Sequence, residues 1–185
     1  MPTWRERLRS IWEWIKRPRG RRAIYRDMRS MALGLDAAAI RMPEGERWSG
    51  ALVAAMEIGL PEATTTVVAI ADGSVSMYLS RGGGVVGAGE HAAVRGAAEQ
   101  FRTVVAENHG LMERTGVFPP PAVGEVRFHA RIGDDRLTGS APESALRTGR
   151  HPLAPLYAAG QDVLTEIRLT TEAEESAAPG PSIEP

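Results

Sequence analysis

The glycine-rich stretch from Gly82 to Gly89 has residue types and spacing that can bind phosphate. Its glycines fit the pattern G-x-G-x-x-G between an expected strand and an expected helix. In dinucleotide-binding proteins, such glycines let the backbone approach a pyrophosphate at a helix N-terminus. The stretch is therefore an alternative small-ligand or nucleotide site. Its members are Gly82, Gly83, Gly84, Gly87, Gly89, His91 and Arg95.

Three features favour a structural role for these glycines. Asp72-Gly73 joins two strands as a tight hairpin, so the strand before the glycines belongs to an antiparallel pair. A fingerprint helix starting near Gly84 would contain several glycines, each costing about 1 kcal/mol relative to alanine. No apolar strand follows the expected helix, and no Gly-Lys-Ser/Thr occurs. We expect the glycines to shape the corner where a strand leads, through a short third strand, into a helix.

A second candidate is a row of basic side chains. Arg127, His129 and Arg131 alternate along an expected strand, so they lie on one face. With Tyr78 of an earlier strand they form a candidate interface on a sheet face that we expect no helix to cover. A solvated face is the simpler alternative, and an acidic partner or a second copy of the chain is the functional one. We do not expect nucleic acid to bind, because other aromatic platforms for bases are missing.

Catalytic patterns are absent from the sequence. The four histidines are scattered, and no cysteine exists for thiolate chemistry or zinc binding. No G-x-S-x-G nucleophile elbow occurs, and Asp134-Asp135 fits a turn better than a metal site. We expect no catalytic residue, no metal and no cofactor. Whether the protein is an enzyme stays open, with a non-enzymatic role favoured.

The N-terminal residues have the clearest functional pattern. Residues 1–30 hold ten basic and three acidic side chains, a net charge of +7, whereas residues 31–185 carry −8. An amphipathic helix is expected from about residue 3 to residue 17, ending at Pro18 and Gly20. Its apolar stripe consists of Trp4, Leu8, Ile11, Trp12 and Ile15. The basic residues counted with it as a membrane- or partner-binding surface are Arg5, Arg9, Lys16, Arg17, Arg19, Arg21 and Arg22.

A basic amphipathic helix with tryptophans can lie in a membrane interface, dock on a partner or pack on its own domain. The membrane is favoured, because the segment combines apolar area with positive charge. The sequence thus predicts a non-enzymatic cytoplasmic adaptor, peripheral on the inner face of the membrane or docked to a partner. A protein partner or a homo-oligomer is expected, and an anionic membrane surface is the second expected contact.

The remaining elements predict one α/β domain. Residues 1–22 form the basic helix, residues 23–169 the domain, and residues 170–185 a disordered tail rich in Glu, Pro, Ala and Ser. The expected helices span residues 23–40, 48–58, 90–108 and 153–169. The expected strands span residues 64–71, 74–80, 84–88, 125–132 and 136–138.

This order predicts the α+β class, with a mostly antiparallel sheet of four to five strands and helices packed on one face. The sequence of helix, hairpin, helix, hairpin and helix is similar to the element order of small roadblock and profilin-like modules. That similarity concerns element order alone and implies a compact module of this class.

Overall fold

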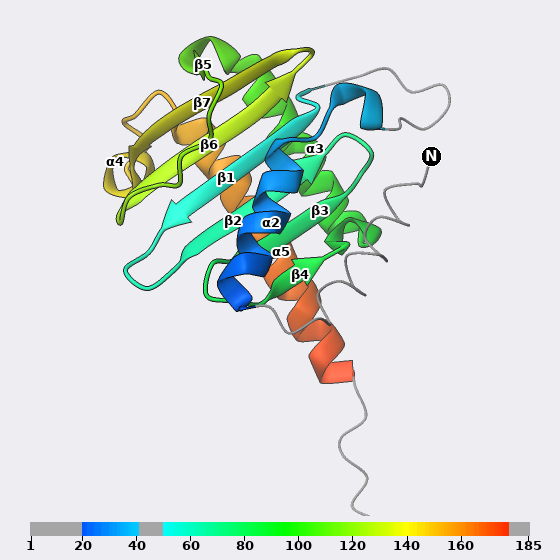
Figure 1. Cartoon of the computed structure of the whole chain (residues 1–185). Coiled ribbons are helices and arrows are strands. Elements are labelled where there is room, and N and C mark those ends of the chain that lie inside the picture. The colour runs from blue at the N-terminus through cyan, green and yellow to red at the C-terminus, as the bar shows by residue number, and fades with distance from the viewer. Residues whose placement is uncertain (1–19, 41–49, 178–185) are drawn as a thin grey trace, which may run out of the picture.

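The computed structural model describes residues 20–40 and 50–177. They form an α+β fold around one open antiparallel sheet (Figure 1). The strands are β1 (Val53–Gly59), β2 (Thr64–Ile70), β3 (Val75–Leu79), β4 (Gly84–Val86), β5 (Glu113–Arg114), β6 (Glu125–Ile132) and β7 (Asp135–Pro142). The helices are α2 (Arg21–Leu33), α3 (Ala92–Glu107), α4 (Glu143–Arg147) and α5 (Ala154–Ala177). The predicted α+β class and antiparallel sheet are confirmed.

The sheet has seven strands in the order β4-β3-β2-β1-β6-β7-β5, so the expected count of four to five is wrong. One extra strand is β1, which lies at the centre of the sheet. Residues 48–58 had suggested a helix because Trp48, Leu52 and Met56 recur at helical spacing. All seven residues of β1 are instead buried. A strand covered on both faces lacks the period of two, so its sequence resembles a buried helix.

Helices cover both faces of the sheet, which corrects the expectation of helices on one face. In Figure 1, α2 lies in front of the sheet, while α3 and α5 lie behind it. The larger core fills the space between the sheet and α3 and α5. Its fully buried side chains include Met56, Val67, Phe101, Phe128, Leu156 and Val163. The smaller core lies under α2 and includes Tyr25, Met28, Leu33, Ala55, Val68 and Tyr78.

Close approach of α5 to the sheet depends on one glycine. A Cβ added to Gly160 would lie 2.6 Å from the sulfur of Met56 on β1. Glycine therefore lets the helix axis come nearer to the central strand than alanine would. The same helix continues to Ala177, eight residues past the expected end at Leu169. Residues 170–177 are thus helical where disorder was expected, and residues 178–185 lie outside the described part.

Other local expectations agree with the structure. The strand predicted at residues 125–132 is β6 with the same bounds, and those at 64–71 and 74–80 are β2 and β3. The short strand expected after the glycines is β4, and the helix expected at 90–108 is α3. The partner of β6 is longer than predicted, because β7 pairs along the whole of β6. In the described ranges, no helix is both long enough and apolar enough to cross a membrane.

Candidate functional site

The predicted interface residues do share one sheet face, but that face is covered. Register pairs Arg127 with Glu57, Glu57 with Thr66, and Thr66 with Tyr78, so these residues form a row across four strands. The exposed fraction is 8% for Tyr78 and 1% for His129. The prediction of an open polar face is therefore wrong. The helix that covers it, α2, was expected on the opposite side of the sheet.

A buried polar network lies between α2 and this face, centred on Glu57 of β1. Arg29 of α2 donates two hydrogen bonds, from Nε to Oε1 and from Nη2 to Oε2 of Glu57, both at 2.6 Å. Thr66 donates to Oε1 at 2.8 Å, and the Tyr25 hydroxyl lies 2.9 Å from the Thr66 oxygen. His129 Nε2 lies 3.1 Å from Oε2. The two carboxylate oxygens of Glu57 thus bind side chains from α2, β2 and β6.

The network controls the charge of Glu57, whose side chain is fully buried. Burial raises the pKa of this carboxyl. Hydrogen bonds and charge from Arg29 and His129 lower it by more, so the net pKa is about 2. Burial also raises the pKa of the Tyr25 hydroxyl, with the charge of Glu57 as the next cause. At neutral pH, Glu57 is therefore ionised and paired, while Tyr25 is a neutral donor.

The hydrogen bonds continue from His129 to β7. The Thr138 hydroxyl oxygen lies 3.1 Å from His129 Nδ1 and also 3.1 Å from the carbonyl oxygen of Phe128. The Thr138 hydroxyl donates its single proton to the Phe128 carbonyl, and its oxygen faces Nδ1 of His129. Glu57, His129 and Thr138 then stand in the order carboxylate, imidazole, hydroxyl, the order used in nucleophilic catalysis.

Two observations indicate that the row of Glu57, His129 and Thr138 has a structural role. Arg29 occupies both oxygens of Glu57, which leaves the carboxylate little basicity to support an imidazolium. Both ring nitrogens of His129 contact protein groups, and the ring is 1% exposed. Phe118 covers it further, with ring centroids 5.2 Å apart in a T-shaped contact. The network ties α2 to the sheet.

Arg131 and Arg127 have different surroundings on β6. Arg131 donates to the carbonyl oxygen of Leu35 at 3.1 Å and to that of Gly133 at 3.2 Å, so it links the chain after α2 to the β6–β7 turn. Arg127 donates from Nη2 to Glu125 at 2.9 Å. The Nε atom of Arg127 is buried without a hydrogen-bond partner among the described residues.

The structure places the first three glycines of the predicted site in a hairpin. The first glycines lie between β3 and β4, which are antiparallel, with positive φ at Gly82, Gly83 and Gly84. Gly89 packs so tightly that an added Cβ would lie 1.9 Å from the carbonyl oxygen of Gly73. These geometries need glycine for the backbone, as the corner interpretation predicts.

The two polar residues beside the glycines already bind protein groups. Arg95 donates to the carbonyl oxygens of Gly89 at 2.9 Å and Glu90 at 3.1 Å. His91 Nε2 lies 3.2 Å from a carboxylate oxygen of Glu174 near the end of α5. The side chains that could bind an anion thus stabilise the corner before α3. The ligand-binding alternative stays a prediction.

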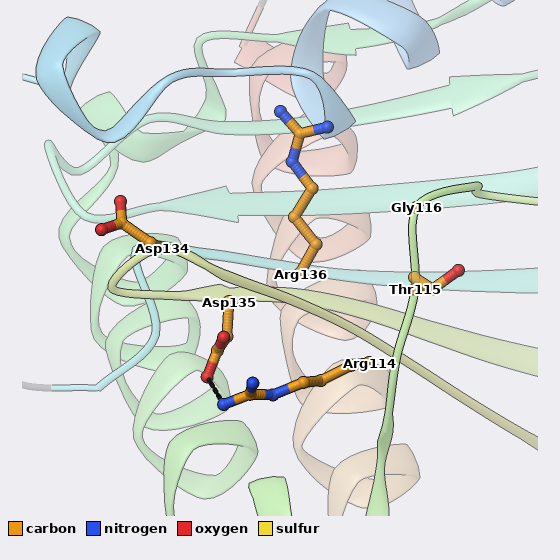
Figure 2. Close-up of a pocket in the computed structure, with 6 residues that line it drawn as sticks. All are labelled: Arg114, Thr115, Gly116, Asp134, Asp135 and Arg136. Carbon is orange, nitrogen blue, oxygen red and sulfur yellow. Dashed lines mark hydrogen bonds and ion pairs between the residues drawn. The ribbon is translucent and has the colours of Figure 1, made fainter.

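A shallow hollow lies beside the β6–β7 turn (Figure 2). Asp135 pairs with Arg114 at 2.7 Å, whereas Asp134 points away from that pair. The two carboxylates therefore do not converge on a common point, in agreement with the turn predicted there. Among residues 20–40 and 50–177, no group of three or more His, Asp or Glu is placed to hold a metal ion.

The predicted membrane- or partner-binding surface lies mostly outside the described residues. This applies to Trp4, Arg5, Leu8, Arg9, Ile11, Trp12, Ile15, Lys16, Arg17 and Arg19. Arg21 and Arg22 instead begin α2, and Arg22 is exposed.

Sequence reasoning missed Glu57 and Arg29 as partners. The available signal was a single acid inside the apolar run LVAAMEIGL, which needs a buried counter-charge if the run is a strand.

Comparison with known proteins found no match to a family model, to a curated protein or to a solved structure.

Proposed function

We propose that this protein is a non-enzymatic adaptor that binds an anionic membrane surface through residues 1–22 and presents its α/β body to a partner. The single observation behind the proposal is the composition of those residues. A stripe of two tryptophans and three aliphatic side chains alternates with basic residues at helical spacing. Peripheral attachment needs both apolar burial and charge, and this segment supplies both.

The described structure supports the proposal through the attachment of α2. The basic segment leads directly into α2, and α2 is fixed to the sheet by the Arg29–Glu57 ion pair. Arg22 and Arg26, on the exposed side of α2, extend the basic segment onto the body. A bound N-terminal segment would therefore hold the whole sheet near the surface.

The similarity of element order to roadblock and profilin-like modules belongs to the same proposal. Modules of that layout are compact platforms, which suits a body presented to a partner or to a second copy. The cytoplasmic location is likewise part of the proposal.

Flotation of the full-length chain with phosphatidylglycerol-containing vesicles tests this function. We expect the protein to float, and Trp12→Glu to lower the bound fraction by about tenfold, because it puts a charge in the apolar stripe. Trp14→Glu is the matched control, since Trp14 lies outside that stripe. High salt should reduce binding only in part. Failure of the full-length chain to float would refute the membrane function.

A further inference from the structure

The outer edge of β7 is covered only in part. Its inner edge pairs with β6 along the whole strand, from Asp135 to Pro142. On the outer side, β5 pairs with Leu137 and Thr138 alone. Among residues 20–40 and 50–177, no strand pairs with this edge beyond Thr138. An uncovered strand edge is a template on which a further strand can form.

The hydrogen-bond register shows which main-chain groups face the open edge. In an antiparallel sheet, the N–H and C=O of one residue point to the same side, and successive residues alternate. The carbonyl oxygen of Arg136 accepts from the N–H of Thr115, just after β5, at 2.9 Å. Ser140, four residues further along β7, therefore directs its N–H and C=O away from β6. Pro142, the next residue with this orientation, has no N–H to offer.

A hollow of about 330 Å³ opens beside Ser140, and one of its walls is apolar. Leu111, which is 47% exposed, and Leu153 line it together with Gly139. A Cβ added to Gly139 would lie 3.4 Å from Leu153 Cδ1, so this wall lies on the face of the sheet that α3 and α5 cover. A hollow of this volume can hold a large side chain.

The other wall of the hollow is polar. Arg127 of β6 lies opposite Ser140 in register and also lines the hollow. Its side chain is 19% exposed and donates from Nη2 to Glu125, while Nε has no hydrogen-bond partner among the described residues. The guanidinium thus keeps the capacity to donate to a further acceptor. Side chains of an added strand would alternate between the apolar wall and this arginine.

We infer that the open edge of β7 binds an extended peptide segment of a partner protein, which adds a strand beside Ser140. The segment places a large apolar side chain against Leu111 and Leu153, and its neighbour in sequence presents an acceptor to Arg127. Main-chain hydrogen bonds with Ser140 fix the segment, and the hollow selects its side chains. The inference rests on the proposed function, because it names the surface that the adaptor presents to its partner.

Amide hydrogen exchange, followed by NMR on the full-length protein, tests the edge directly. In the free protein we expect fast exchange at Ser140 and slow exchange at Gly139 and Ala141, whose amides face β6. The probes are short synthetic peptides selected on the full-length protein from a random display library. A saturating peptide should slow exchange at Ser140 by about tenfold or more. Peptides that bind without protecting this amide would overturn the inference.

Two variants test the contacts. Leu111→Asp puts a charge on the apolar wall and should raise the Kd of a selected peptide about tenfold. Val117→Asp is the matched control, since Val117 is 70% exposed and lies outside the hollow. Ser140→Pro removes the outward N–H without removing a bond to β6, and should also weaken binding about tenfold.

Equal affinity of the natural chain and both variants, or a library that yields no binding peptide, would overturn the inference. Flotation of the same proteins separates the two claims, because peptide binding and membrane binding use different residues. Protein that floats but binds no peptide keeps the membrane function without the open-edge site. Protein that binds peptides at Ser140 but never floats keeps the site and refutes the membrane function.

Discussion

The two faces of the sheet are stabilised by different chemistry. Under α3 and α5 the contacts are almost entirely apolar, as shown by Phe101, Phe128 and Leu156, each 0% exposed. Under α2 the apolar contacts surround a charged carboxylate with donors from α2, β2 and β6. Apolar packing tolerates substitutions of similar volume, whereas a buried ion pair requires both partners. The comparison indicates that the ion pair fixes the position of α2, whereas buried apolar surface holds α3 and α5 on the sheet.

Arg29→Met tests this difference with the largest expected effect. It leaves Glu57 buried without its counter-charge, so we expect a loss of about 3–5 kcal/mol in the free energy of unfolding. Urea denaturation of the full chain measures it. The double variant Arg29→Met/Glu57→Met removes both charges and should recover most of the loss. Equal losses in the single and double variants would show that the loss does not come from an unpaired Glu57 charge.

Acid titration sharpens the same comparison. Glu57 has a pKa of about 2 in the folded protein against an ordinary value of 4.5. Its contribution to the free energy of unfolding is complete above about pH 4.5. As the pH falls toward 2, up to about 3 kcal/mol of that contribution is lost. Denaturation curves at several pH values measure this loss.

The double variant should lose less stability over the same acid range, because it lacks the carboxylate. Leu156→Ala is the matched control on the other face, and its cost should change little with pH. If the double variant and the natural chain lost stability equally in acid, the loss would not come from Glu57.

Two glycine substitutions give the smallest effects and concern the face covered by α3 and α5. Gly89→Ala brings a methyl group against the carbonyl oxygen of Gly73 and should cost about 1–3 kcal/mol. Gly96→Ala lies inside α3 with open space around it and should stabilise the protein by about 0.5–1 kcal/mol. Thermal unfolding measures both. Equal effects at the two positions would contradict the tight packing of Gly89.

Local patterns predicted the elements in which polar and apolar side chains alternate or in which a strong helical stripe occurs. The alternation of Val126, Phe128 and Ala130 identified β6, and the stripe through Val94 and Phe101 identified α3. They did not identify β1, because a strand buried on both faces has no alternation. They also could not place α2, because an amphipathic helix can cover either face of a sheet.

The candidate site was predicted only in part. His129 and Tyr78 were found on the correct face, but as an open interface. Glu57 and Arg29 were missed, since 28 residues separate them along the chain and their pairing depends on the crossing of α2 over β1.

By itself, the sequence determined the α+β class, the hairpins at Asp72-Gly73 and Gly133, the structural use of the glycines and the segregation of basic charge at the N-terminus. These follow from local backbone preferences and periodicity, which act over a few residues. Tertiary structure alone decided that the row containing His129 is buried, that Glu57 is its centre, and that a groove lies between α4, α5 and the end of β1. Each of these depends on which distant segments meet, and so on burial, which no local pattern encodes.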